Sequence, residues 1–132
     1  MAKRMNAKIK ALWVKALRSG KYKQTRFCLR DEVDDSYCCL GVLCDLYAKE
    51  HKDAKWKDDM GDIGFIASKG SNFESRVLPK KVTQWAGINS IGKLNKPHAS
   101  LIELNDDCKY SFKKIAKVIE EQLWENYLRT YL

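Results

Sequence analysis

The chain has 132 residues, of which 45% are hydrophobic and 32% charged, and its formal net charge is +8 at pH 7. This length and composition exclude a disordered chain and predict a single domain over residues 1–132. The positive balance favours an anionic partner, such as a phosphorylated small molecule, a nucleic acid or an acidic protein. No stretch approaches the roughly 18 apolar residues of a membrane-spanning helix, and the first residues lack a signal-peptide pattern. We therefore expect no membrane partner and a cytoplasmic location.

The five cysteines are expected to be reduced thiols, because an odd number in a cytosolic protein argues against a disulfide framework. Their spacings, together with those of the two histidines, do not match a zinc site. We expect neither a metal nor another cofactor, and we interpret the cysteines by default as small buried apolar residues.

The first helix is predicted over residues 6–18. Its apolar residues follow the spacing of one helical face: Ile9, Leu12, Trp13, Ala16 and Leu17. Most of its lysines lie away from that face. Gly20 follows, and glycine suits the left-handed conformation that commonly ends a helix.

A hairpin and a central helix are predicted next. Residues 25–29 favour a strand, residues 31–36 a polar turn, and residues 36–39 a returning strand. Residues 39–50 are nearly uncharged and predict a helix that other elements surround. Gly41 inside this helix indicates the close approach of another backbone, for which the first helix is the candidate.

The second half of the chain reads as loops and two helices. Residues 51–72 predict a long loop with a short strand at 63–67. A short helix is expected from Pro79, at its first position, to Gly87. Residues 101–104 fit a strand or a helical turn, and residues 105–107 a turn.

A further helix is predicted over residues 111–128, with Ser111 as its N-cap. The fold class is therefore α+β: a mainly helical single domain of three longer helices and one short helix around a small hairpin or short sheet.

Basic and aromatic residues alternate between Lys21 and Arg30, which suits phosphates and bases, since Arg supplies forked donors and aromatic rings stack on bases. The predicted ligand-binding residues are Tyr22, Lys23, Gln24, Arg26, Arg30 and Trp85. The competing interpretation is a solvated hairpin with its aromatic residues in the core. The lysines of the first helix could also lie against a nucleic-acid backbone.

A cysteine-dependent hydrolase is an alternative. Cys38 or Cys39 would lie at a helix N-terminus, where the helix dipole lowers a thiol pKa, with His98 as base and Asn105 or Asp106 as orienting residue. The apolar surroundings favour burial instead, which raises a thiol pKa.

Several segments occur in a recognisable order. They are residues 13–24, the Tyr-Cys-Cys-Leu-Gly-Val-Leu-Cys-Asp-Leu-Tyr segment at 37–47, Leu78-Pro79 through Trp85-Ala86-Gly87, and Leu104-Asn105-Asp106 followed by Ser111-Phe112 and Ile115-Ala116. Together they resemble small, mostly uncharacterised proteins of tailed bacteriophages and prophages. The resemblance covers most of the chain and names no activity or catalytic residue.

The resemblance implies a setting in the cytoplasm of a bacterial host. By analogy with phage proteins that capture immune signals, the leading hypothesis is an accessory, anti-defence protein that binds an anionic nucleotide-derived molecule without turnover, as a homo-oligomer. The alternatives are the cysteine-dependent hydrolase, and an inhibitor of a host protein or a nucleic-acid-binding regulator.

Overall fold

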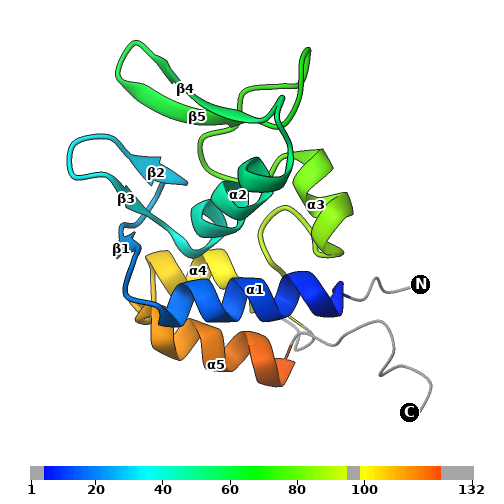
Figure 1. Ribbon diagram of the computed structural model, residues 1–132. Coiled ribbons are helices and arrows are strands. Elements are labelled where there is room, and N and C mark those ends of the chain that lie inside the picture. Colours follow the sequence, from blue (N-terminus) through cyan, green and yellow to red (C-terminus); the bar gives the residue numbers. More distant parts are fainter. Residues whose placement is uncertain (1–4, 95–98, 123–132) are drawn as a thin grey trace.

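The computed structural model describes residues 5–94 and 99–122, and helix α2 (Cys39–Glu50) lies at the centre of the fold (Figure 1). The other elements are, in chain order, α1 (Ala7–Arg18), β1 (Lys23–Gln24), β2 (Arg30–Asp31), β3 (Ser36–Tyr37), β4 (Lys55–Asp59), β5 (Asp62–Ile66), α3 (Lys80–Ala86), α4 (Leu101–Asp106) and α5 (Phe112–Gln122). Helices α1 and α5 pack together on one side of α2, and the β4–β5 hairpin lies on the opposite side. The predicted α+β class is confirmed, with α4 as a further short helix.

The two outer helices form where their apolar periodicity predicts them. Asn6 caps α1, since its side-chain oxygen accepts a hydrogen bond from the backbone N–H of Ile9 at 3.0 Å. Ser111 likewise accepts a hydrogen bond from the backbone N–H of Lys114 at 3.2 Å, as an N-cap would. The prediction for residues 111–128 is confirmed over α5, and its last residues, 123–128, lie outside the described part of the chain.

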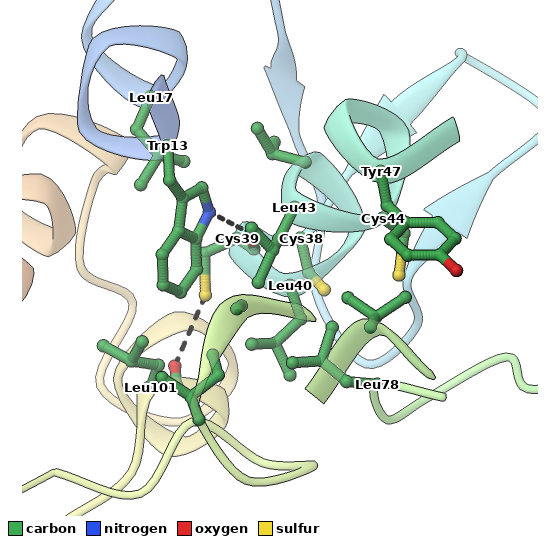
Figure 2. Close-up of a cluster of buried hydrophobic side chains, with 14 of the residues drawn as sticks. Trp13, Leu17, Cys38, Cys39, Leu40, Leu43, Cys44, Tyr47, Leu78 and Leu101 are labelled. Carbon is green, nitrogen blue, oxygen red and sulfur yellow. Dashed lines mark hydrogen bonds between the residues drawn. The ribbon is translucent and has the colours of Figure 1, made fainter. Parts of the chain in front are cut away.

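Helix α2 begins and ends where its sequence predicts. Its first six residues and Tyr47 are buried. The side chain of Cys38 caps it by accepting a hydrogen bond from the backbone N–H of Gly41. The indole Nε1 of Trp13 donates to the carbonyl oxygen of Cys39 at 3.0 Å, which ties α1 to the first turn of α2 (Figure 2). A fully buried tryptophan needs such a partner for its N–H.

Gly41 meets a neighbouring backbone, as predicted, but the neighbour is not the first helix. A Cβ atom at this position would lie 1.9 Å from the carbonyl oxygen of Leu29, in the segment that leads into β2. Only glycine lets α2 pass so close to that segment.

The small sheet has the strand order β1-β3-β2, with β1 parallel and β2 antiparallel to β3. The predicted hairpin is confirmed in β2 and β3, but the predicted strand at residues 25–29 is wrong. Phe27 in that segment has a positive φ of 70°, which no strand residue adopts. The pairing residues are instead those on either side of the segment.

Residues 51–72 contain a two-stranded hairpin, so the prediction of a long loop is wrong. Strands β4 and β5 pair antiparallel, and Met60 and Gly61 form the turn between them. Both turn residues have positive φ, 54° and 89°, as in the type I′ turn that suits the twist of a hairpin. The strand expected at 63–67 corresponds to β5.

The remaining short helices correct two details. Pro79 is the N-cap of α3 with extended backbone, rather than its first helical residue, while Gly87 ends the helix in the left-handed conformation as predicted. Of the two structures predicted for residues 101–104, the helical one forms, as the start of α4. The turn predicted at 105–107 is wrong, because Asn105 and Asp106 continue α4.

Candidate functional site

Two residues of the hydrolase alternative, Cys39 and Asn105, are packed into the interior. Cys39 has no exposed surface, and its thiol contacts the carbonyl oxygen of Leu101 (Figure 2). Burial raises the pKa of the Cys39 thiol well above its ordinary value, and a thiol held neutral is a weak nucleophile. His98 lies outside the described residues. The arrangement gives Cys39 the surroundings of a packing residue.

Asn105 is fully buried and uses its whole amide group inside the fold. Its Oδ1 atom accepts hydrogen bonds from the Nε2 of Gln24 at 2.8 Å and from the backbone N–H of Cys39 at 3.2 Å. Its Nδ2 atom donates to the carbonyl oxygen of Thr25 and to the carboxylate of Asp106, both at 2.9 Å. Asn105 therefore joins α4 to the start of α2 and to the segment after β1.

Three of the predicted ligand-binding residues have partners within the protein. The hydroxyl of Tyr22 donates to Asp45 at 2.5 Å, and burial, followed by this hydrogen bond, raises the pKa of Tyr22. Lys23 pairs with Asp34 at 3.2 Å. The amide of Gln24 donates to Asn105 and to the backbone of Tyr110, which leaves it no free donor for a ligand.

The two predicted arginines have different surroundings. Arg30 pairs with Asp35 at 2.7 Å, and its guanidinium lies 5.0 Å from the ring centre of Tyr37 and 5.4 Å from that of Trp56. The Nε atom of Arg26 is buried and has no hydrogen-bond partner among the described residues. Of the two arginines, Arg26 is therefore the one with a buried polar atom that no described residue pairs.

Trp85 does not join the other predicted residues. Its ring makes edge-to-face contacts with Tyr47 and His51 at the end of α2, whereas Tyr22 and Arg30 both contact Tyr37. The rings between these two groups form a chain of contacts in the order Tyr37, Trp56, Phe65 and Tyr47. These rings build the core between α2 and the β4–β5 hairpin, whereas Phe27 of the basic and aromatic segment is 58% exposed.

A different surface gathers the positive charge. An open groove of about 690 Å³ runs along α1, which we call the α1 groove; it is lined by Lys10, Ala11, Val14, Lys15, Arg18, Ser19, Lys21 and Glu120. Ala11 and the buried Val14 give it a small apolar patch, beside which Lys15, Arg18 and Lys21 are exposed, while Lys10 is buried. Such a combination suits a ligand that has both a negative charge and an apolar surface.

The single carboxylate of the α1 groove is already paired. Arg18 contacts both oxygens of Glu120, at 2.9 Å and 2.6 Å, and this contact holds the pKa of Glu120 below its ordinary value. The ammonium group of Lys10 donates to the backbone carbonyl oxygen of the same residue at 3.3 Å. The exposed Lys15 and Lys21 therefore add positive charge that no groove carboxylate balances.

The sequence contains a signal for this groove that the motif search did not use. The first 30 residues include no Asp or Glu, and their basic residues are Lys3, Arg4, Lys8, Lys10, Lys15, Arg18, Lys21, Lys23, Arg26 and Arg30. The lysines noted on the first helix belong to this run. Lys10, Lys15 and Arg18 of α1 and Lys21 after it line the groove, whereas the alternation after Lys21 suggested a strand that does not form.

A second cleft lies between the tips of the two hairpins. It has a volume of about 570 Å³ and is lined by Cys28, Arg30, Asp31, Glu32, Val33, Gly61, Asp62 and Ile63. Carboxylates outnumber the single cation here, so this cleft does not suit an anion. Cys28 in the cleft is half-buried, and burial raises the pKa of its thiol.

The described residues contain neither a membrane-crossing helix nor a cluster of possible metal ligands. None of their helices combines the length and the apolar character that a membrane crossing requires. Within residues 5–94 and 99–122, no three His, Cys, Asp or Glu side chains are grouped so that they could hold a metal ion.

Comparisons with known proteins identify a family and no activity. No curated protein and no solved structure matches the chain. One family model matches residues 5–123, which is nearly the whole chain and includes α1, the α1 groove and both hairpins. The chain therefore belongs to the family described as a domain of unknown function (DUF8296).

Proposed function

We propose that this protein binds an anionic, nucleotide-type small molecule in the α1 groove and releases it unchanged. The observation that carries the proposal is the groove itself, in which Lys15, Arg18 and Lys21 are exposed beside Ala11 and the one carboxylate among its described lining residues, Glu120, is paired. Phosphate groups would lie against the ammonium and guanidinium groups, and the sugar or base against Ala11.

The proposal moves the site away from the residues predicted from the sequence. Tyr22, Gln24 and Arg30 already bind other parts of the protein, so using them for a ligand would break contacts of the fold. Lys15 and Lys21 can bind a ligand without breaking such contacts. The resemblance to phage proteins motivates the setting, in which the ligand is an immune signal of the bacterial host and the protein acts in the host cytoplasm.

Binding without turnover is favoured over hydrolysis by the position of the thiols. Cys38, Cys39 and Cys44 are buried, and burial raises the pKa of each. Cys108 is exposed but lies after α4 and does not line the α1 groove. Among the described residues that line the groove there is no thiol, histidine or unpaired carboxylate that could act as nucleophile or base.

The test is calorimetry with cyclic dinucleotides, cyclic oligonucleotides and ADP-ribose, with adenosine as the uncharged comparison. The Lys15→Gln/Lys21→Gln variant should bind at least about tenfold more weakly, since charge-assisted hydrogen bonds contribute about 1.5–3 kcal/mol each. The control is Lys52→Gln/Lys69→Gln, which removes the same charge from exposed positions outside the groove and should bind like the natural protein.

Three results would contradict the proposal. They are no heat with any charged ligand, an equal loss of affinity in the control variant, and recovery of a converted ligand by mass spectrometry after incubation. Single-stranded oligonucleotides are titrated in a separate calorimetry experiment. Tighter binding to them, with the steep salt dependence of counterion release, would assign the α1 groove to nucleic acid instead.

A further inference from the structure

Each of the two hairpins exposes an apolar residue at its tip. Val33, in the turn between β2 and β3, is 94% exposed, and Met60, in the turn between β4 and β5, is 100% exposed. Both turns border the cleft between the hairpins, and both point to the same side of the molecule (Figure 1). We call this surface, with its surrounding carboxylates, the hairpin tips; the carboxylates are Asp31, Glu32, Asp34, Asp35, Asp58, Asp59 and Asp62.

Met60 is an unfavourable residue for its position. A type I′ turn requires positive φ at both central residues, and asparagine, aspartate or glycine is favoured there. Met60 adopts a φ of 54° and gains no burial in return, since its whole side chain faces solvent. A strained residue that contributes nothing to the core indicates a contact outside the chain.

The α1 groove has the complementary properties on another part of the same molecule. Lys15, Arg18 and Lys21 are exposed beside its apolar patch, whereas the apolar side chains of the hairpin tips are surrounded by carboxylates. Figure 1 places the hairpin tips and α1 at separate parts of the molecule, so both can be engaged at once.

We propose that the hairpin tips of one copy of this protein dock into the α1 groove of a second copy. Val33 and Met60 contact the exposed Ala11, and the carboxylates of Asp59 and Asp62 pair with Lys15 and Lys21, which are exposed in the groove. The two surfaces differ, so the contact is heterologous and joins copies head to tail. It also places a second copy and the proposed ligand in competition for one groove.

The salt concentration should determine how strongly two copies associate. Two molecules of net charge +8 repel each other at a distance, but this repulsion is screened beyond about 10 Å at 0.1 M salt. Pairs in direct contact are screened much less. Association should therefore be visible by sedimentation velocity at about 0.1 M salt and a protein concentration on the order of 100 µM, as suits a small and weak interface, and should weaken at about 0.5 M salt.

Charge reversal tests the two surfaces separately. Asp59→Lys/Asp62→Lys alters the tips and keeps the hydrogen bond from Gly61 to Asp58, while Lys15→Glu/Lys21→Glu alters the groove. Each variant alone should remain monomeric. An equal mixture should associate again, because it contains one intact groove and one intact set of tips.

Met60→Asn gives a readout of opposite sign. Asparagine suits the turn, so the temperature of unfolding should stay equal or rise, while self-association should weaken about tenfold with the loss of one buried anchor. Circular dichroism of every variant checks that the fold is intact. A natural protein that stays monomeric at low salt would overturn the proposal, as would charge-reversed variants that associate like the natural protein or a mixture that stays monomeric. Failure of ligand binding in the groove leaves these results unaffected.

Discussion

Replacing Gly41 by alanine tests the central packing of the fold. Alanine normally stabilises a helix interior by about 1 kcal/mol relative to glycine. Here the added Cβ would lie 1.9 Å from the carbonyl oxygen of Leu29, so α2 and that segment would have to separate by about 1 Å. The segment cannot move freely, since Leu29 donates to the carbonyl of Ser75 at 2.7 Å and accepts from the N–H of Cys38 at 3.0 Å.

The expected cost follows from these contacts. Overpacking costs about 1–3 kcal/mol, and weakening one of the two backbone hydrogen bonds adds about 1 kcal/mol. After the gain in helix propensity, Gly41→Ala should lower the free energy of unfolding by about 2–3 kcal/mol. With a typical urea dependence of about 2 kcal/mol per molar, the midpoint of denaturation should fall by about 1–1.5 M.

The measurement is urea denaturation followed by tryptophan fluorescence and circular dichroism. Ala48→Gly in the same helix is the matched control, and it should lose about 1 kcal/mol through propensity alone. Glycine should thus be favourable at position 41 and unfavourable at position 48. If Gly41→Ala were as stable as the natural protein, the close approach of Leu29 to α2 would be refuted.

Three further predictions concern buried groups. Asn105→Ala should lower the free energy of unfolding by about 3 kcal/mol, since it leaves several buried partners unpaired; a loss below about 1 kcal/mol in urea denaturation would contradict this. Iodoacetamide at neutral pH should label the exposed Cys108 rapidly and Cys39 only after unfolding, and mass spectrometry showing similar rates in the folded protein would contradict the burial of α2. Burial raises the pKa of Tyr37 to about 12, and that of Tyr22 rises further, so their stabilisation is complete below about pH 10 and is lost as the pH rises beyond it. The midpoint of urea denaturation should fall as the pH rises from 10 to 12, and it should fall less steeply in the Tyr22→Phe variant. If the midpoint fell equally steeply in the variant and the natural protein, ionisation of Tyr22 would not be the cause.

The helices could be predicted because several signals agree at each of them. In α1 and α5 an apolar face coincides with a capping side chain, and α2 is too apolar to lie anywhere but the centre. The β4–β5 hairpin could not be predicted in the same way. Strand β4 is almost entirely charged, and its turn has Met60 where a hairpin signal would have asparagine or aspartate. Pairing with β5, which no local pattern reveals, makes it a strand.

The candidate site was missed for a related reason. Alternation of basic and aromatic residues predicts a shared face only if the segment is a strand, and Phe27 interrupts that strand with a positive φ. Tyr22 and Arg30 reach the aromatic core by separate routes, while Trp85 lies at the other end of α2. The helix periodicity that correctly predicts α1 also places lysines of the groove on that helix. The residue pattern alone, however, gives no reason to choose these lysines over the other basic residues as a binding site.

The packing of α1 on α5 determines when this protein can fold during its synthesis. Lys10 and Arg18 of α1 contact Glu120 of α5, which follows Arg18 by 102 residues. A chain emerging from the ribosome therefore carries α1 without its partner helix until α5 has also been translated. Until then the apolar side of that first helix stays in contact with solvent or a chaperone.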